Sequence, residues 1–274
     1  MARLSSGLVF VATLMTTMGV ASLAGAAVTP QVLINFDGTL AGTTYTLGAG
    51  ELDNSFTFGS NGLATVSGGI GDISGDLDAT GSGPGGNGSG FYFNGVLLGL
   101  GSLQNVSWVT EALVAFDVPV ASQPATFNHI LDVQGDTFLR FDGNGHNPRI
   151  TNFGYWDGSN EQINVISDLS TNGYSHVALV WDAPNTKVEA FINGTSQGVV
   201  DLAAFDVSSP NVGYGFFSRF LNRAIDGKLD AVAFSTYTGA FDPASDFQLA
   251  VVPEPSSLAL AACVLAGLAG WKKK

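Results

Sequence analysis

The decisive stretch of this sequence is Gly173–Val200, which reads GYSHVALVWDAPNTKVEAFINGTSQGVV. Apolar and polar residues alternate in 176–181 and again in 187–192, a pattern typical of β-strands. Residues 182–186 are rich in turn formers and separate the two segments. Asn193-Gly194 then favours a type I′ turn, because both residues tolerate a positive φ. The stretch therefore predicts two strands joined by a turn, followed by a second, tighter turn.

One face of these strands is expected to lie in the core of the protein. Alternate residues of a strand point to the same side of a sheet. Trp108, in an earlier predicted strand, is expected in the core as well. We interpret His176 as a packed or hydrogen-bonded histidine and not as a general base. The residues that share a face are Val177, Leu179 and Trp181 in the first segment, and Val188, Ala190 and Ile192 in the second.

The rest of the chain consists largely of short apolar segments separated by turn formers. Segment 106–118 predicts a strand, because it alternates and is enriched in Val and Thr. Segment 90–98 predicts a strand with a turn at Asn94-Gly95, and the glycine-rich segment 67–90 predicts a long loop within one domain. Short strands with turn signals about every eight to twelve residues predict an all-β sandwich or barrel.

The first 26 residues have the organisation of a secretory signal peptide. Arg3 lies near the start, an apolar run covers 8–20, and Ala24-Gly25-Ala26 supplies the small residues of a cleavage site. A first transmembrane helix is the alternative, but the apolar run is short and contains several threonines. We expect cleavage after Ala26 and a folded domain over residues 27–250.

The segment 251–274 combines three features in order. Pro253-Glu254-Pro255 comes first, an apolar stretch over 256–271 follows, and Lys272–Lys274 ends the sequence. As a helix, this stretch would span roughly 24 Å, somewhat less than a hydrocarbon core of about 30 Å. Trp271 suits the membrane interface, and the lysines suit its cytoplasmic side. The segment therefore predicts a short transmembrane helix with a basic tail.

This three-part arrangement resembles the PEP-CTERM sorting signal of Gram-negative bacteria. The resemblance implies that an exosortase-type transpeptidase recognises the segment and cleaves near Pro253-Glu254-Pro255. It implies that the helix anchors the protein transiently in the inner membrane before delivery to the cell surface or the extracellular matrix. The expected partners are this processing enzyme and, outside the cell, polysaccharide.

The composition of residues 27–250 suits an extracellular setting and disfavours nucleic acid as a partner. This range contains no methionine and no cysteine, since Cys263 lies in the C-terminal segment. Omitting Arg3, Lys272–Lys274 and Glu254 leaves six basic and 22 acidic residues, a balance of −16. So acidic a surface offers no basic patch to neutralise phosphates, but it leaves carboxylates available for Ca²⁺.

Three segments resemble laminin-G-like and concanavalin-A-like domains. YSHVALVWD…KVEAFING, from residue 174, is similar to the family's WHHVALVYD…VxLYVNG. The segment 225–235, IDGKLDAVAFS, is similar to its FxGxIDEVxIY, and 106–117 to its early central strand FTxEAWV. The resemblance implies a jelly roll, so we predict an all-β, two-sheet antiparallel jelly-roll sandwich between a signal helix and a transmembrane helix. The chain departs from the family's pattern, which has Trp, His and Glu at these places, at Tyr174, Ser175 and Ala231.

No catalytic residue is predicted. Jelly-roll glycoside hydrolases place their carboxylates on one strand as ExDx(x)E, and this sequence has no such run. Asp157 and Glu161 are separated by an evident turn, and no GxSxG elbow is present. The histidines lack zinc spacing. We therefore expect a protein without enzymatic activity, with an unusual or degenerate glycoside hydrolase as an alternative.

A structural Ca²⁺ site is considered at two places. The resemblance points to Asp37 after the first strand, together with Asp226 or Asp230 near the last. Independently, Asp76 and Asp78 reproduce the DxDxxG opening of a calcium loop, but the twelfth position is Asn87 and not a bidentate Glu. Solvated aspartates in turns are the alternative for both places.

The best candidate for ligand binding is the segment YWDGSN. We expect a loop that presents Tyr155 and Trp156 beside the polar groups of Asp157 and Asn160, which suits a sugar. Packing of Trp156 under the rim of the sandwich is the alternative. The resulting hypothesis is a carbohydrate-binding or adhesion module, and the alternative is a structural matrix protein without a specific ligand.

Overall fold

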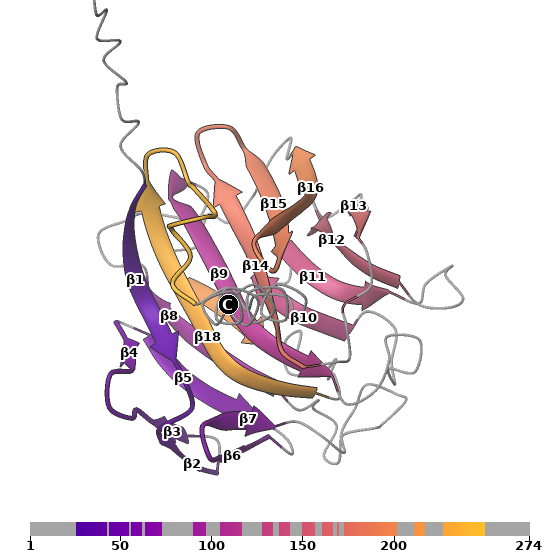
Figure 1. Cartoon of the computed structure of the whole chain (residues 1–274). Coiled ribbons are helices and arrows are strands. Elements are labelled where there is room, and N and C mark those ends of the chain that lie inside the picture. The colour runs from indigo at the N-terminus through magenta and orange to yellow at the C-terminus, as the bar shows by residue number, and fades with distance from the viewer. Residues whose placement is uncertain are drawn as a thin grey trace, which may run out of the picture.

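Two antiparallel β-sheets pack face to face in the structure, a computed structural model (Figure 1). It describes residues 26–42, 44–54, 56–61, 64–72, 90–96, 105–116, 128–133, 137–142, 150–156, 161–166, 169, 173–201, 211–216 and 227–249. The predicted two-sheet antiparallel sandwich is confirmed over these ranges. The predicted helices in 1–26 and 251–274 lie outside them. Within the described ranges, no helix is long and apolar enough to cross a membrane.

The first sheet contains the decisive stretch at one of its ends. Its strands follow the order β16-β15-β14-β9-β18-β1-β4, with β7 paired to β18 and β6 paired to β7. Its strands are β1 (Ala27–Ile34), β4 (Leu52–Asp53), β6 (Thr65–Ser67), β7 (Ile70–Asp72), β9 (Ser107–Phe116), β14 (Ser175–Asp182), β15 (Lys187–Ile192), β16 (Thr195–Asp201) and β18 (Gly227–Thr238).

The second sheet follows the order β13-β12-β11-β10-β17-β8-β5-β3-β2. Neighbouring strands in it come from distant parts of the chain, as in β10, β17 and β8. Its strands are β2 (Thr39–Ala41), β3 (Thr44–Thr46), β5 (Phe56–Asn61), β8 (Gly90–Val96), β10 (Asn128–Val133), β11 (Thr137–Asp142), β12 (Ile150–Trp156), β13 (Glu161–Ile166) and β17 (Asn211–Phe216).

The predicted hairpins around β15 are confirmed. β15 pairs with β14 on one side and with β16 on the other. Asn193 and Gly194 have φ values of 49° and 74°, the positive angles that a type I′ turn requires. The Asn193 backbone N–H donates to the His176 carbonyl at 2.8 Å, and its Oδ1 accepts from the His176 N–H at 2.9 Å. Asn193 therefore closes the turn and also ties it to β14.

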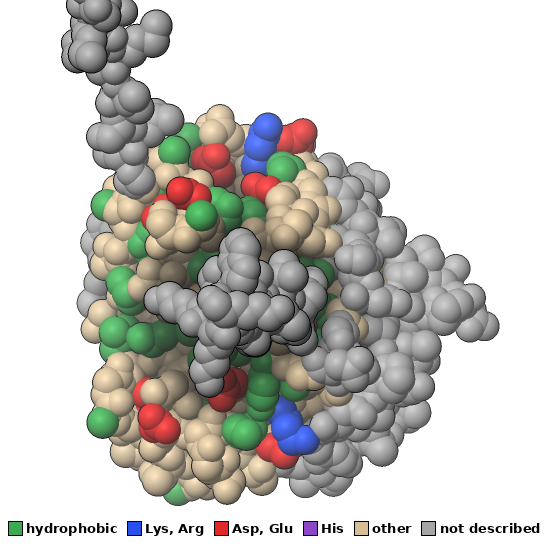
Figure 2. Space-filling model, in the orientation of Figure 1, with side chains coloured by type: hydrophobic (Ala, Val, Ile, Leu, Met, Phe, Trp, Pro, Cys, Tyr) green, Lys and Arg blue, Asp and Glu red, His purple; other side chains and the backbone are tan. Residues whose placement is uncertain are grey.

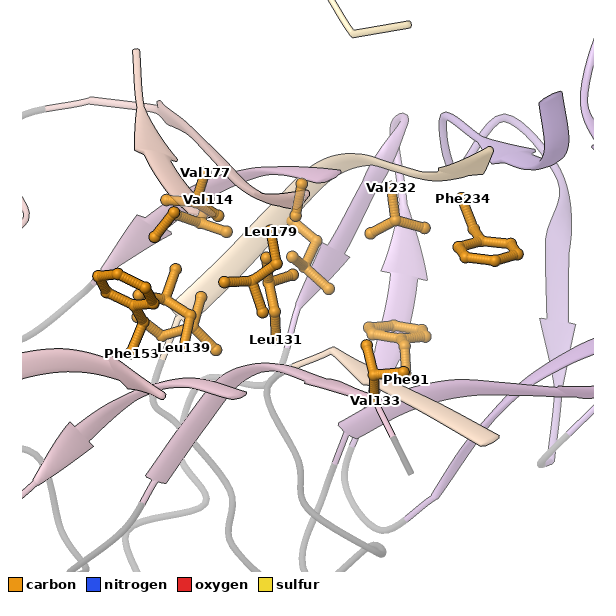
Figure 3. Packing of buried hydrophobic residues seen from close by; sticks show 14 of the residues in the cluster. Phe91, Val114, Leu131, Val133, Leu139, Phe153, Val177, Leu179, Val232 and Phe234 are labelled. Carbon is orange, nitrogen blue, oxygen red and sulfur yellow. The ribbon is translucent and has the colours of Figure 1, made fainter. Parts of the chain in front are cut away.

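The core lies between the two sheets (Figure 3). Trp108 and Trp181 occupy opposite positions on β9 and β14, and neither is exposed to solvent. Burial of one large apolar side chain contributes about 1.5–3 kcal/mol, so the predicted tryptophans are major contributors to stability. In Figure 3, side chains of the first sheet point toward those of the second, with Val114, Val177, Leu179, Val232 and Phe234 on one side and Phe91, Leu131, Val133, Leu139 and Phe153 on the other.

The turn predicted at Asn94-Gly95 does not exist, because both residues lie inside β8. They pair with β17 on one side and with β5 on the other. Two ladders of hydrogen bonds outweigh the local turn preference of the dipeptide. The expected loop over 67–90 is also shortened, because Ile70–Asp72 forms β7 and pairs with β18. Residues 73–89 lie outside the described ranges.

The chain continues from β18 across the outer face of the first sheet, the face that points away from the core. We call residues 239–249 the strap. Its Phe241 and Phe247 pack against Val109, Ala178, Val180, Phe191 and Tyr237 on that face. Leu249 packs against Ala231 and Ala233 of β18. The strap therefore covers part of a sheet face that would otherwise be apolar and exposed.

Candidate functional site

A buried carboxylate holds the end of the strap. Glu111 lies on β9 and has no exposed surface. Its Oε1 accepts the backbone N–H of Gln248 at 3.0 Å, and its Oε2 accepts that of Leu249 at 3.1 Å. The same Oε2 lies 3.0 Å from Nε2 of His176, which is equally buried. The prediction that His176 is a packed, hydrogen-bonded histidine is confirmed, and its role is to clamp the strap.

Aromatic rings continue this attachment along the strap. The Phe247 ring centroid lies 4.6 Å from that of His176 and 5.4 Å from that of Phe191, both in edge-to-face geometry. Phe241 lies 5.2 Å from Phe247 and 5.1 Å from Tyr237. Such pairs contribute about 0.5–1.5 kcal/mol each beyond the area that they bury. The first sheet and the strap thus share one aromatic cluster.

A cleft of about 400 Å³ opens between this cluster and the hairpins of β14, β15 and β16. Figure 2 shows this side of the molecule, where acidic side chains gather over the upper ends of β14, β15 and β18 around a basic one. The volume falls within the range of about 300–1,000 Å³ that is typical of small-molecule sites. The lining residues include Val180, Asp182, Lys187, Glu189, Phe191, Ser196, Val199, Tyr237, Phe241 and Pro243.

The polar groups of the cleft are held in place. Asp182 accepts the side-chain N–H of Asn185 at 2.7 Å, and Glu189 accepts the hydroxyl of Ser196. Lys187 lies 3.5 Å from Asp201 across the strand pair. Burial raises the pKa of Tyr237 well above its usual range, and the negative charges of Asp182 and Glu189 raise it further. Tyr237 stays protonated, and its hydroxyl donates to the Trp181 carbonyl at 2.9 Å.

The outer face of the second sheet carries a different arrangement. One cross-strand line on this face interleaves glycines with aromatic and acidic residues. These positions alternate with the buried Phe91, Leu131, Leu139 and Phe153, so they lie on the side that faces away from the core. Glycine within a strand permits close approach to the backbone. The line runs through Gly59, Tyr92, Gly215, Asp132, Phe138 and Gly154.

A second line on the same face consists of polar residues. His129, Arg140 and Asn152 occupy directly opposite positions on β10, β11 and β12. Arg140 is only 2% exposed, and the other two have no exposed surface. Buried charged and amide groups are costly unless they are hydrogen-bonded. These side chains point away from the core and are nevertheless buried, as is Gly154, so this part of the outer face is covered and not open to solvent.

Tyr155 and Trp156 do not lie on a loop. They end β12, where they pair with Gln162 and Glu161 of β13. They are consecutive residues of a strand and not neighbours on a loop, so the expected loop pair does not form. Asp157 and Asn160 lie outside the described residues.

The structure brings together no metal-binding group within the described ranges. Oδ2 of Asp37 accepts the side-chain N–H of Asn35 at 3.0 Å, and Asp230 is exposed on β18. Asp226, Asp76 and Asp78 lie outside these ranges. The Ca²⁺ site stays a prediction.

Two carboxylates of structural importance were missed by sequence reasoning. Glu51 accepts the backbone N–H groups of Asn35 and Asp37 at 2.9 and 3.2 Å, and the hydroxyl of Tyr45 at 2.9 Å. Glu111 holds the strap. The available signal for Glu111 was an acidic residue within an otherwise apolar strand, because a buried carboxylate needs partners. No comparable signal marked Glu51, which lies in a turn-rich segment.

No protein-family model and no curated protein matches the chain. Among solved structures, the CBM2 module of Lactobacillus casei BL23 phage J-1 evolved Dit has 12% identity and a TM-score of 0.45, over 80% of this chain and 100% of that one. Domain 4 of AbnA, a GH43 extracellular arabinanase from Geobacillus stearothermophilus in complex with arabinotriose, has 14% identity and a TM-score of 0.43, over 79% and 96%. The carbohydrate recognition domain of Emp47p has 9% identity and a TM-score of 0.42, over 76% and 97%. Because these sequence identities are low and these TM-scores are below 0.5, the likenesses carry no conclusion about the function of this chain.

Proposed function

We propose that this protein is a secreted carbohydrate-binding module without catalytic activity, and that polysaccharide binds at the end of β12, where Trp156 precedes Asp157 and Asn160 in the sequence. The observation that carries the proposal is this position of Trp156, at the last residue of a strand of the second sheet and directly before a polar segment. Sugars are bound by aromatic platforms beside hydrogen-bonding groups.

The test is binding of the purified protein to an array of bacterial exopolysaccharides and plant and microbial glycans. Wild-type protein should bind at least one polymer, and Trp156→Ala should weaken that binding about tenfold, since stacking on one ring contributes on the order of 1 kcal/mol. Tyr155→Ala is the matched control, because it removes an aromatic ring at the neighbouring strand position, which alternation assigns to the other side of the sheet. It should leave the affinity of the folded fraction unchanged.

Absence of binding by the wild type would contradict the proposal and favour a structural matrix protein. Such a protein would still give a matrix defect on deletion of the gene. Release of reducing sugar from a bound polymer would instead favour a glycoside hydrolase. The three functions thus differ in binding, in product formation and in deletion phenotype.

We also propose that residues 1–26 direct secretion and that 251–274 sort the protein to the cell surface. The start of β1 at Ala27, directly after the expected cleavage site, supports the first part. The short distance between the strap and Pro253 supports a processing site just outside the fold. Mass spectrometry of the mature protein should find Ala27 as the first residue and an end near Pro253-Glu254-Pro255. Glu254→Ala should leave the C-terminal segment attached and the protein in the membrane fraction.

A further inference from the structure

The cleft on the first sheet is lined by two kinds of side chain. Phe191, Tyr237 and Phe241 supply aromatic rings, and Asp182 and Glu189 supply carboxylates on the adjacent strands β14 and β15. Neither kind would indicate a ligand by itself. The cleft of about 400 Å³ brings both kinds together, so they can act on the same guest.

The charge of the cleft is negative where the guest would lie. Asp182 and Glu189 face a single ammonium group, that of Lys187, and Lys187 is engaged by Asp201 at 3.5 Å. The fields of both carboxylates reach Tyr237 on β18, because both raise the pKa of its hydroxyl. A surrounding surface with a strong acidic excess adds to this potential. An anionic guest would therefore be repelled.

Rings and carboxylates together favour one chemical class. Aromatic faces attract organic cations through their quadrupole. Carboxylates accept hydrogen bonds from the N–H groups of such a cation, or attract its positive charge where it has no N–H group. The backbone beside the two carboxylates is rigid, because Asn193 closes the β15–β16 turn and Asn185 binds Asp182. A rigid site loses little conformational entropy on binding.

We propose that this cleft is a second binding site and that it takes an organic ammonium group attached to an apolar or sugar framework. An amino sugar of a polysaccharide and a choline-type head group share this chemistry. The site lies on the opposite sheet from the polysaccharide site proposed above and does not depend on it. If both sites bind matrix components, the protein can link two chains, and avidity then exceeds either affinity alone.

The experiment is calorimetric titration of the purified full-length protein with three probes. They are the glucosamine trimer, the N-acetylglucosamine trimer and choline. The two trimers have the same rings and differ in the charge on nitrogen. We expect the glucosamine trimer to bind about tenfold more tightly than its acetylated form, and its affinity to fall as NaCl is raised. Binding of choline alone would support the ammonium site and would identify a choline-type head group as the natural source of the ammonium group.

Charge-removing variants connect the binding to the cleft. Asp182→Asn and Glu189→Gln should each weaken binding about fivefold, as expected for the loss of one partly exposed charge partner. Asp230→Asn is the matched control, because Asp230 is an exposed acid of the same sheet that does not line the cleft. Thermal midpoints of all variants show that they remain folded. Lys187→Ala should leave binding unchanged or strengthen it.

Three results would overturn the proposal. The first is measurable and equal binding of the amino and acetylated trimers, and the second is absence of heat with all three probes up to about 10 mM. The third is equal binding by Glu189→Gln, Asp182→Asn and Asp230→Asn. Failure of this site is distinguishable from failure of the proposed polysaccharide site, because Trp156→Ala should weaken binding only at the polysaccharide site.

Discussion

Glu111 is fully buried and satisfies two backbone amides that lie 137 and 138 residues further along the chain. Replacement by Gln puts an NH₂ group where one of these N–H groups, or His176, expects an acceptor. Hydrogen bonds to buried charged groups contribute about 1.5–3 kcal/mol, so we expect Glu111→Gln to lower the free energy of unfolding by about 2–3 kcal/mol. Urea denaturation measures this difference. Glu189→Gln, which changes a half-buried carboxylate of the cleft, should cost less than about 1 kcal/mol. Equal midpoints for the two variants would contradict the role assigned to Glu111.

Tyr237 should make stability depend on alkaline pH. Its folded-state pKa is raised, first by burial and then by the charges of Asp182 and Glu189, whereas tyrosine in an unfolded chain titrates near 10. The folded state therefore holds this proton more tightly, and the free energy of unfolding falls as pH rises above about 10. Tyr45 shifts in the same direction, through burial and its hydrogen bond to Glu51. Tyr237→Phe should be less stable at neutral pH but show a shallower loss between about pH 9 and 11. Denaturation curves at these pH values test the slope, and an unchanged slope would contradict the prediction.

At the scale of the element, the strap should open without unfolding the sandwich. Phe247 connects it to Phe191 and His176, and its ring is the central one of the cluster. Phe247→Ala should therefore accelerate amide hydrogen exchange at Gln248 and Leu249, whose N–H groups bind Glu111, by tenfold or more. Amides of β9 and β14 should remain protected. Loss of protection in both regions would show that the strap and the sheet unfold as one unit.

The elements that sequence could predict are those specified by local information. The two hairpins follow from alternation and from the turn residues 182–186 and Asn193-Gly194, so their strands were placed to within one or two residues. Asn94-Gly95 failed as a turn signal because partners on both sides, distant in sequence, hold it in a strand. Tyr155 and Trp156 were assigned to a loop by the turn formers that follow them. Pairing with β11 and β13 extends the strand instead, and this pairing joins segments that local sequence does not connect.

The candidate sites were less predictable than the strands. The cleft combines residues from β14, β15, β16, β18 and the strap, and no spacing in the sequence connects Glu189 with Phe241. The attachment of Gln248 to Glu111 is similarly non-local. Periodicity could place each residue on a face but not identify which distant segment would cover that face. Sequence reasoning therefore described the sheets better than it described their outer surfaces.

For the molecule as a whole, charge repulsion should limit stability at low salt. Residues 27–250 contain 22 acidic and six basic residues, and the repulsion among them acts over a Debye length of about 30 Å at 10 mM salt but about 8 Å at 150 mM. Raising NaCl over this range should therefore raise the thermal midpoint by a few degrees. Sucrose at matched osmolality is the control for solvent effects unrelated to charge. A midpoint that falls or stays constant would show that attractive charge pairs dominate.

The attachment of the strap also sets a timing for maturation. Leu249 is fixed to the first sheet, and Pro253 follows only four residues later, a reach of at most about 14 Å. Under the proposed sorting, a membrane enzyme that binds an extended peptide ahead of Pro253 would have to bind Gln248 and Leu249, whose backbone N–H groups donate to Glu111. Cleavage would then wait for the strap to detach, and its rate would report how often detachment occurs. Variants that loosen the clamp, such as Glu111→Gln, would be released from the membrane sooner than the wild type.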